Sequence, residues 1–109
     1  MKEKLEFLLE PQMFKAWLAD HRPNDVVGVG CEPHACPIAC YLKDMGAGQQ
    51  VKVIAEQGEW LALLPDGEAV PLPKWAGRFA YMVDRLRPKE AISAQYALGI
   101  LREILRGGD

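Results

Sequence analysis

Residues 51–72 constrain the fold more than any other part of the chain, because strand-like segments alternate there with turn signals. In residues 51–56, Val51, Val53 and Ala55 alternate with Lys52, Ile54 and Glu56, as the side chains of a strand with one buried face do. Pro65-Asp66-Gly67 is a strong turn signal between two further apolar runs. We therefore expect an antiparallel meander with strands at 51–56, 60–64 and 69–72, a tight turn at Gln57-Gly58, and Pro71 and Pro73 at a sheet edge.

Apolar side chains recur at helical spacing on both sides of this meander. Pro11 and Pro37 suit the first turn of a helix, and Ser93 is a good N-cap for the last one. On the helix expected at 74–86, the apolar stripe consists of Trp75, Phe79, Met82, Val83 and Leu86. Outside the meander the sequence predicts helices at 2–9, 11–20, from near Cys36 to the glycines at 46 and 48, at 74–86 and at 94–106, and a short strand at 26–29.

The order α-β-α-β-β-β-α-α predicts an α+β fold, with helices packed on a small, mostly antiparallel sheet. A length of 109 residues, half of them apolar, fits one domain over residues 1–109 with one core. The first 14 residues lack the apolar run of a signal peptide, and no segment approaches the ~18 apolar residues of a membrane span. Three clustered cysteines are too few for a secreted disulfide framework, so we expect a cytoplasmic protein with reduced thiols and no membrane contact.

The stretch 26–41 holds all three cysteines and one of the two histidines. Cys31, His34, Cys36 and Cys40 are four candidate metal ligands within ten residues, and zinc binds such ligands in a tetrahedron. Structural zinc sites usually join two separated ligand pairs, whereas these four residues are local. A loop that enters a helix could still wrap them around one ion. We therefore expect no cofactor, with zinc as the alternative that this cluster leaves open.

A reactive thiol is a second interpretation of the same cluster. Cys36 falls at the N-terminus of an expected helix, where free N–H groups and the helix dipole stabilise a thiolate. His34 is close in sequence and could act as its base. A cysteine nucleophile also needs a residue that orients the base, and none can be named, since His21 lies upstream at a helix end. Cys36 and His34 are thus the catalytic candidates, and the incomplete set favours a protein that is not an enzyme.

The cysteines also fit a purely structural role. Unpaired cysteine is among the most buried residue types and behaves as a small hydrophobe. On a helix, Ile38, Tyr41 and Leu42 would face the core, with Cys36 and Cys40 on the opposite side. These two cysteines would therefore be buried only if another element covers that side.

Charge is unevenly distributed along the chain. Residues 1–73 carry 6 Lys and Arg against 11 Asp and Glu, whereas residues 74–109 carry 7 against 4. On the expected helix 74–86, a basic stripe lies opposite the core face and consists of Lys74, Arg78, Tyr81 and Arg85. The stripe could be an ordinary solvated face, or it could bind an acidic partner or a nucleic-acid backbone. It could also meet the acidic part of a second copy, giving a homo-oligomer.

These observations favour a small binding or regulatory module that acts through macromolecular interaction, with a protein as its partner. Its partner-binding candidates are the four residues of the basic stripe. The alternative is a metal-binding or reactive-thiol protein that uses the cysteine and histidine cluster. Nucleic-acid binding through the 74–86 helix is a third reading, but a net charge of −2 gives it no general electrostatic support.

Overall fold

Proline and serine residues mark several element boundaries in the structure. Pro11 and Pro37 each begin a helix, at a position where the missing N–H would have had no partner. Ser93 caps the last helix, because its Oγ accepts the backbone N–H of Tyr96 at 3.1 Å. The helix starts predicted from these residues are confirmed.

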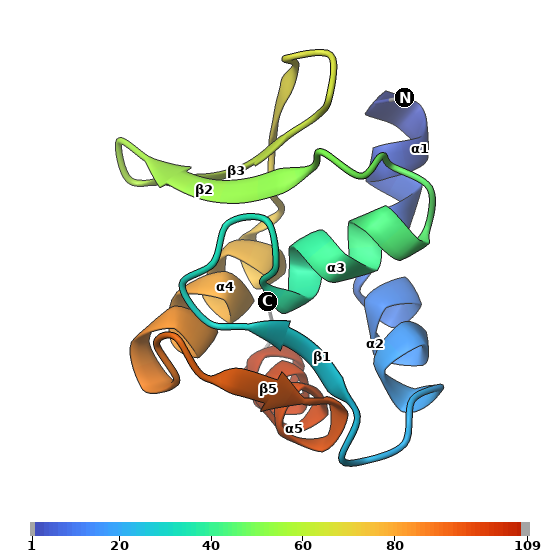
Figure 1. Ribbon diagram of the computed structural model, residues 1–109, viewed down its shortest axis with the longest axis vertical. Coiled ribbons are helices and arrows are strands. Elements are labelled where there is room, and N and C mark those ends of the chain that lie inside the picture. Colours follow the sequence, from blue (N-terminus) through green and yellow to red (C-terminus); the bar gives the residue numbers. More distant parts are fainter. Residues whose placement is uncertain (1, 108–109) are drawn as a thin grey trace.

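The computed structural model describes residues 2–107, which form a single small α+β domain (Figure 1). The helices are α1 (Lys2–Leu8), α2 (Pro11–Ala19), α3 (Pro37–Asp44), α4 (Lys74–Leu86) and α5 (Ala94–Arg106). The strands are β1 (Val26–Val29), β2 (Lys52–Glu56), β3 (Glu59–Leu63), β4 (Ala69–Pro71) and β5 (Ala91–Ser93). No helix within residues 2–107 is long and apolar enough to cross a bilayer.

The predicted α+β class is confirmed, and the strands form two small antiparallel sheets where one was expected. One sheet has the order β2-β3-β4, and the other pairs β1 with β5. The sequence did not predict β5, because it is three residues long and only Ile92 in it is buried. Its partner strand, β1, comes from a distant part of the chain, so no local sequence pattern predicts that the two strands pair.

The turns of the three-stranded sheet agree with the sequence. Gln57 and Gly58 both have positive φ, 52° and 82°, as a type I′ hairpin turn between β2 and β3 requires. Gly67 has a φ of 91° in the turn between β3 and β4. Because β4 is an edge strand, Pro71 removes no hydrogen bond that the sheet needs. The predicted tight turn and the edge position of Pro71 are confirmed, whereas Pro73 lies just beyond β4 as the N-cap of α4.

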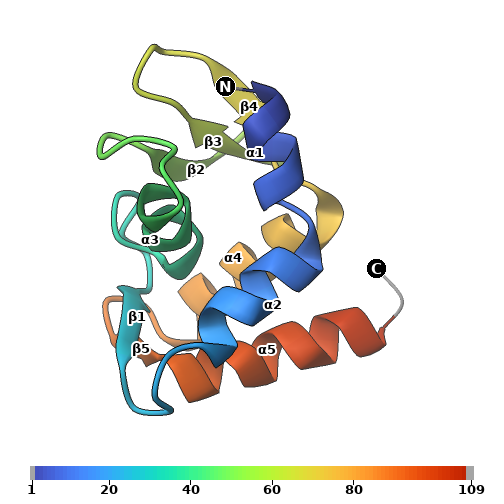
Figure 2. The same cartoon turned by 90° about the vertical axis from the view of Figure 1, so that its right-hand side faces the viewer.

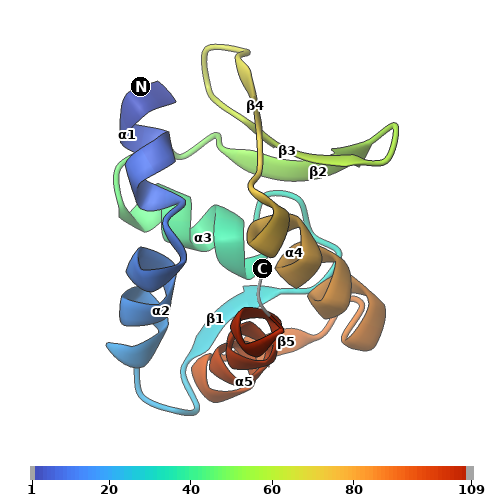
Figure 3. The ribbon, with the colours of Figure 1, turned by 180° about the vertical axis from the view of Figure 1, so that it is seen from behind.

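The helices fill the space around and between the two sheets. In Figure 1, α3 lies between the sheets, and it contacts β1 on one side and β2 on the other. Figure 2 shows α2 lying across α5. At the other end of the molecule, residues of α1 and β4 line a common cavity. In Figure 3, α4 lies below the β2–β3 hairpin and packs against both β3 and α5. This arrangement leaves one face of α4 beside the hairpin, where the candidate site forms.

An aromatic cluster centred on Phe14 holds three helices together. The ring centroid of Phe14 lies 5.0 Å from that of Phe79, 5.2 Å from that of Tyr41 and 5.6 Å from that of Trp75. These rings come from α2, α3 and α4, and all four side chains are buried. Such pairs stabilise a fold by about 0.5–1.5 kcal/mol each beyond their area burial.

Leu86 departs from the predicted apolar stripe of α4. Its side chain is 52% exposed, although Trp75, Phe79 and Val83 on the same stripe are buried. Leu86 is the last residue of α4, where the chain turns away through Arg87 toward β5. The predicted core face of this helix is therefore wrong at its last residue and confirmed over its first three turns.

Candidate functional site

The turn from Gly30 to Cys36 is anchored to α4 through Asp84. The backbone N–H of Cys31 donates to Asp84 Oδ1 at 2.8 Å, and its Sγ donates to the Asp84 carbonyl at 3.3 Å. Cys31 has a φ of 60°, which lies in the left-handed region that residues with a side chain rarely adopt. These two contacts hold an unfavourable backbone conformation in place.

Gly30, just before Cys31, is enclosed by the segment that follows α4. Its N–H donates to the Glu90 carbonyl at 3.0 Å, and its own carbonyl accepts the Lys89 N–H at 2.9 Å. A Cβ at this position would lie 2.0 Å from the Arg87 carbonyl oxygen, a distance that no side chain can occupy. The cysteine turn is therefore a rigid, closely packed junction.

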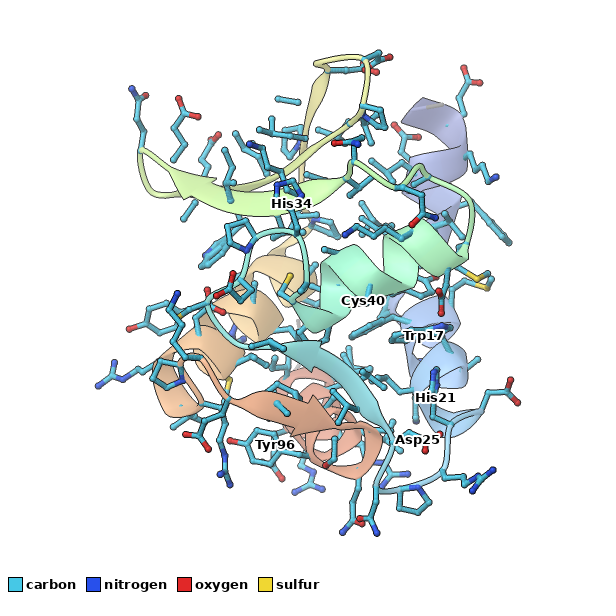
Figure 4. All side chains as sticks on the ribbon, in the orientation of Figure 1. Trp17, His21, Asp25, His34, Cys40 and Tyr96 are labelled. Atoms are coloured by element: carbon cyan, nitrogen blue, oxygen red, sulfur yellow. The ribbon has the colours of Figure 1, made fainter. Side chains whose placement is uncertain are left out.

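The structure does not gather the four predicted metal ligands into one set. Within residues 2–107, no three His, Cys, Asp or Glu side chains lie together in a way that could hold a metal ion. Figure 4 shows His34 beside β2 and Cys40 farther along α3. Cys40 Sγ donates instead to the carbonyl of Ala35 at 3.3 Å.

The proposed reactive thiol lies in the core. Cys36 is the N-cap of α3, as the sequence indicates, but it is only 6% exposed. Burial raises the pKa of its thiol to about 12, and the backbone N–H groups of Ala39 and Ile38 offset only part of that rise. Burial also raises the pKa of the Cys40 thiol. Both thiols are therefore protonated at neutral pH, and the helix N-terminus does not produce a thiolate here.

The basic stripe lies on the exposed face of α4. Its four residues, Lys74, Arg78, Tyr81 and Arg85, are all exposed. Arg85 Nη1 donates to Tyr81 Oη at 2.8 Å, and its guanidinium carbon lies 6.0 Å from the Tyr81 ring centroid. Lys74 and Arg78 each make an interaction within the chain as well. The stripe is thus an ordered surface of cations around an aromatic ring.

A groove of about 310 Å³ lies beside this stripe, between α4 and the three-stranded sheet. We call it the Trp60 groove. Its apolar wall comes from the indole of Trp60 and from the segment that joins β4 to α4. The lining residues are Glu59, Trp60, Pro71, Leu72, Pro73, Lys74, Gly77, Arg78 and Tyr81. Three residues of the predicted basic stripe, Lys74, Arg78 and Tyr81, therefore lie at one groove.

Gly77 allows Trp60 to reach α4. A Cβ on Gly77 would lie 3.2 Å from Cδ1 and 3.5 Å from Cγ of the Trp60 indole. The ring therefore packs against the backbone of α4 at Gly77. Trp60 is half-buried and packs against the core. Its indole is therefore a fixed wall with one side open to the groove.

A second pocket, of about 290 Å³, also has Trp60 in its lining. It is lined by Cys31, Cys36 and Asp84 among others, and we call it the cysteine pocket. Burial raises the pKa of the Asp84 carboxyl, while the hydrogen bond from Cys31 lowers it. Trp60 thus lines both a groove beside the basic stripe and a pocket beside the cysteines, the two regions that the sequence singled out.

Sequence reasoning missed three parts of the groove. The sequence pattern indicates Trp60 only as a strand residue and Pro71 and Pro73 only as edge residues, and it assigns no role to Gly77. One signal was available, since a glycine inside a strongly amphipathic helix costs about 1 kcal/mol and often marks a close approach. Which side chain approaches Gly77 depends on tertiary packing and could not be found from local spacing.

No family model matches the chain, and its comparison with curated proteins and with solved structures gave no significant match. Function must therefore be argued from the geometry of the site.

Proposed function

We propose that this protein is a binding module whose Trp60 groove takes an acidic segment of a partner protein. The main support for the proposal is that the Trp60 groove has an apolar wall and cationic side chains at its rim. Trp60 and the prolines offer flat apolar surface, and Lys74 and Arg78 line the same groove. A segment that fits would place an aromatic or aliphatic side chain on the indole and its carboxylates beside the cations.

The groove suits a peptide better than a small molecule. Sites for small ligands are usually concave and carry convergent polar groups that fix the ligand. Among the described residues, none that is polar or charged is buried, so the groove's polar groups sit at its rim. Rim charges of this kind steer an approaching partner and set its orientation.

Arginine and tyrosine add further support, because both are enriched in protein interfaces. Arg85 and Tyr81 hold each other through a hydrogen bond and a cation–π contact, so less side-chain freedom is lost when a partner binds. The net charge of −2 argues against a nucleic-acid backbone as the partner.

Selection from a displayed library of random peptides tests the proposal. We expect enriched peptides that combine Asp or Glu with an aromatic or aliphatic residue. Their binding should weaken at least about tenfold in the variant Arg78→Glu/Arg85→Glu and at higher salt. Recovery of no peptide, or of peptides that bind the variant equally well, would count against the Trp60 groove.

A control with the same change in net charge separates the groove from general electrostatics. Arg22→Glu/Arg102→Glu alters two exposed arginines that neither belong to the basic stripe of α4 nor line the Trp60 groove. We expect this control to bind the selected peptides as the wild type does. Equal loss in both variants would mean that total charge, and not the groove, captures the peptide.

A further inference from the structure

The exposed face of α1 carries a large apolar side chain among carboxylates. Phe7 is 60% exposed, one of a few large apolar side chains that the described residues leave in solvent. Glu3 lies one helical turn before Phe7 on the same face, whereas Glu6, its neighbour in sequence, is turned by about 100° around the helix, and Glu10 follows just after the helix. All three glutamates are exposed. Lys4, three residues before Phe7, is exposed as well, so the face combines Phe7 with carboxylates and one lysine. An aromatic ring beside carboxylates is what the proposed ligand of the Trp60 groove requires.

The other face of α1 is fixed to the core, so the exposed face has a defined position. Leu5, Leu8 and Leu9 are buried. Tyr41 Oη donates to the Leu8 carbonyl at 2.7 Å, and Trp75 Nε1 donates to the Leu9 carbonyl at 2.9 Å. A partner that binds Phe7 would therefore meet a preorganised helix, with little ordering cost.

The α1 face and the Trp60 groove flank one segment of the chain. Residues 71–73 form one wall of the Trp60 groove, and the same residues line a second cavity of about 440 Å³ with Glu6, Leu9 and Glu10. In Figure 3, α1 lies on one side of β4 and the start of α4 lies below it. A two-fold axis near this segment would bring α1 of each copy to the groove of the other.

We infer that the Trp60 groove binds α1 of a second copy, with Phe7 on the indole and its flanking glutamates beside Lys74 and Arg78. This inference rests on the proposed function and names an occupant for the same groove. Residues 2–10 carry three glutamates against two lysines, and residues 74–109 carry 7 Lys and Arg against 4 Asp and Glu, so the two regions differ in the sign of their net charge. Glu59 is the one acidic residue in the groove lining, and it lies at the end of the β2–β3 hairpin.

Reciprocal contact closes the assembly at two copies. In a two-fold dimer each interface patch meets itself, so both α1 helices and both grooves are used. A contact made only once per pair would leave a free groove and a free helix, and the chain of copies would continue to grow. We therefore expect a dimer and not a fibre.

A charge exchange between the two patches tests the dimer. In sedimentation velocity at low salt, we expect the wild type to pass from monomer to dimer as its concentration rises toward about 1 mM, a range that reaches weak affinities. Glu3→Lys/Glu6→Lys and Lys74→Glu/Arg78→Glu should each be monomeric alone. An equal mixture of the two should form a heterodimer, because every contact again joins opposite charges.

Phe7→Ala provides a second variant that does not depend on charge. Since Phe7 is mostly in solvent, its removal should leave the circular dichroism spectrum and melting temperature near the wild-type values. We expect dimer affinity to fall at least about tenfold. This variant keeps the test decisive if a charge-reversed chain fails to fold.

A wild type that stays monomeric over the whole range, or a mixture that stays monomeric, would overturn the inference. So would a dimer that survives Phe7→Ala unchanged. Binding of the peptide selected by the wild type, measured beside dimer formation, distinguishes failure of this inference from failure of the proposed function. A monomeric wild type that binds the peptide would disprove the dimer alone, whereas failure of both measurements would disprove the groove. Dissociation of the dimer by the peptide would support both.

Discussion

Gly77 and Trp60 lie so close together that a Cβ on the glycine would come within 3.2 Å of the indole. This distance is tighter than a normal side-chain contact, so a larger residue at position 77 would push the ring outward. Because the indole forms the wall of the Trp60 groove, the size of residue 77 sets the shape of that groove.

We predict that Gly77→Ala weakens peptide binding more than it changes stability. The helix gains up to about 1 kcal/mol when alanine replaces glycine, while displacement of the half-buried indole costs a similar amount. The free energy of unfolding should therefore change by less than about 1 kcal/mol in urea titration, and peptide affinity should fall several-fold. Gly99→Ala on α5 is the matched control, since nothing lies within 4 Å of its Cβ. It should stabilise the fold by about 0.5–1 kcal/mol and leave binding intact.

Gly30→Ala should destabilise the protein by about 3 kcal/mol or more, because its Cβ would meet the Arg87 carbonyl at 2.0 Å. The junction between the cysteine turn and the segment after α4 would have to open. Gly67→Ala is a useful comparison, since that residue has a φ of 91° but open space around it. It should cost only about 1–2 kcal/mol from backbone conformation. Equal losses in chemical denaturation would show that the Gly30 junction is less closely packed than described.

Stability should fall steeply at alkaline pH. Burial raises the pKa of Cys36 from 9.0 to about 12. Below pH 9 the thiol is protonated in both states, but between pH 9 and 12 it ionises only when the chain unfolds. Unfolding then releases a proton, so the free energy of unfolding falls as pH rises, by roughly 3–4 kcal/mol from Cys36 alone. Urea titrations at several pH values measure this slope.

Two variants identify the groups behind that slope. Cys36→Ala removes the ionising thiol and should flatten the decline that begins near pH 9. Tyr41→Phe should flatten the part above pH 10, because burial raises the pKa of Tyr41 from 10.0 to about 12. A slope that neither variant alters would contradict the burial of these two groups.

Trp75→Phe should loosen α1 from the core. The substitution keeps most of the buried ring but leaves the Leu9 carbonyl without its donor, at a cost of about 1–3 kcal/mol. Amide hydrogen exchange should accelerate in α1 more than in α5. Because the inferred dimer needs α1 in place, its affinity should fall in parallel. Unchanged exchange in α1 would mean that this hydrogen bond does not fix the helix.

Much of the fold could be predicted from residues that act locally. Pro11, Pro37 and Ser93 mark helix starts through their own backbone chemistry, and Gly58 permits the turn that it was predicted to form. The second sheet could not be predicted, since β5 has one buried residue and finds its partner far away in the chain.

The candidate site was only partly predictable for the same reason. The position of Cys36 at a helix N-terminus is a local property and was predicted, but its burial depends on what packs over it. The basic stripe follows from helical spacing on α4. Its groove exists only because Trp60 of β3 reaches Gly77, and no local pattern contains that contact.

Binding at the Trp60 groove can be measured directly, because the chain has three tryptophan side chains and Trp60 forms the wall of that groove. The indole N–H of buried Trp75 donates to the Leu9 carbonyl, and that of Trp17 donates to Asp44 at 3.1 Å. Neither residue lines the Trp60 groove, so both indole signals serve as internal controls. A selected acidic peptide is titrated into ¹⁵N-labelled protein, and the three indole N–H signals are followed by NMR. We predict that the Trp60 signal shifts most, together with the amides of Gly77 and Tyr81. Shifts concentrated instead at Tyr96, in the groove of about 730 Å³ beside α5, would contradict peptide binding at the Trp60 groove.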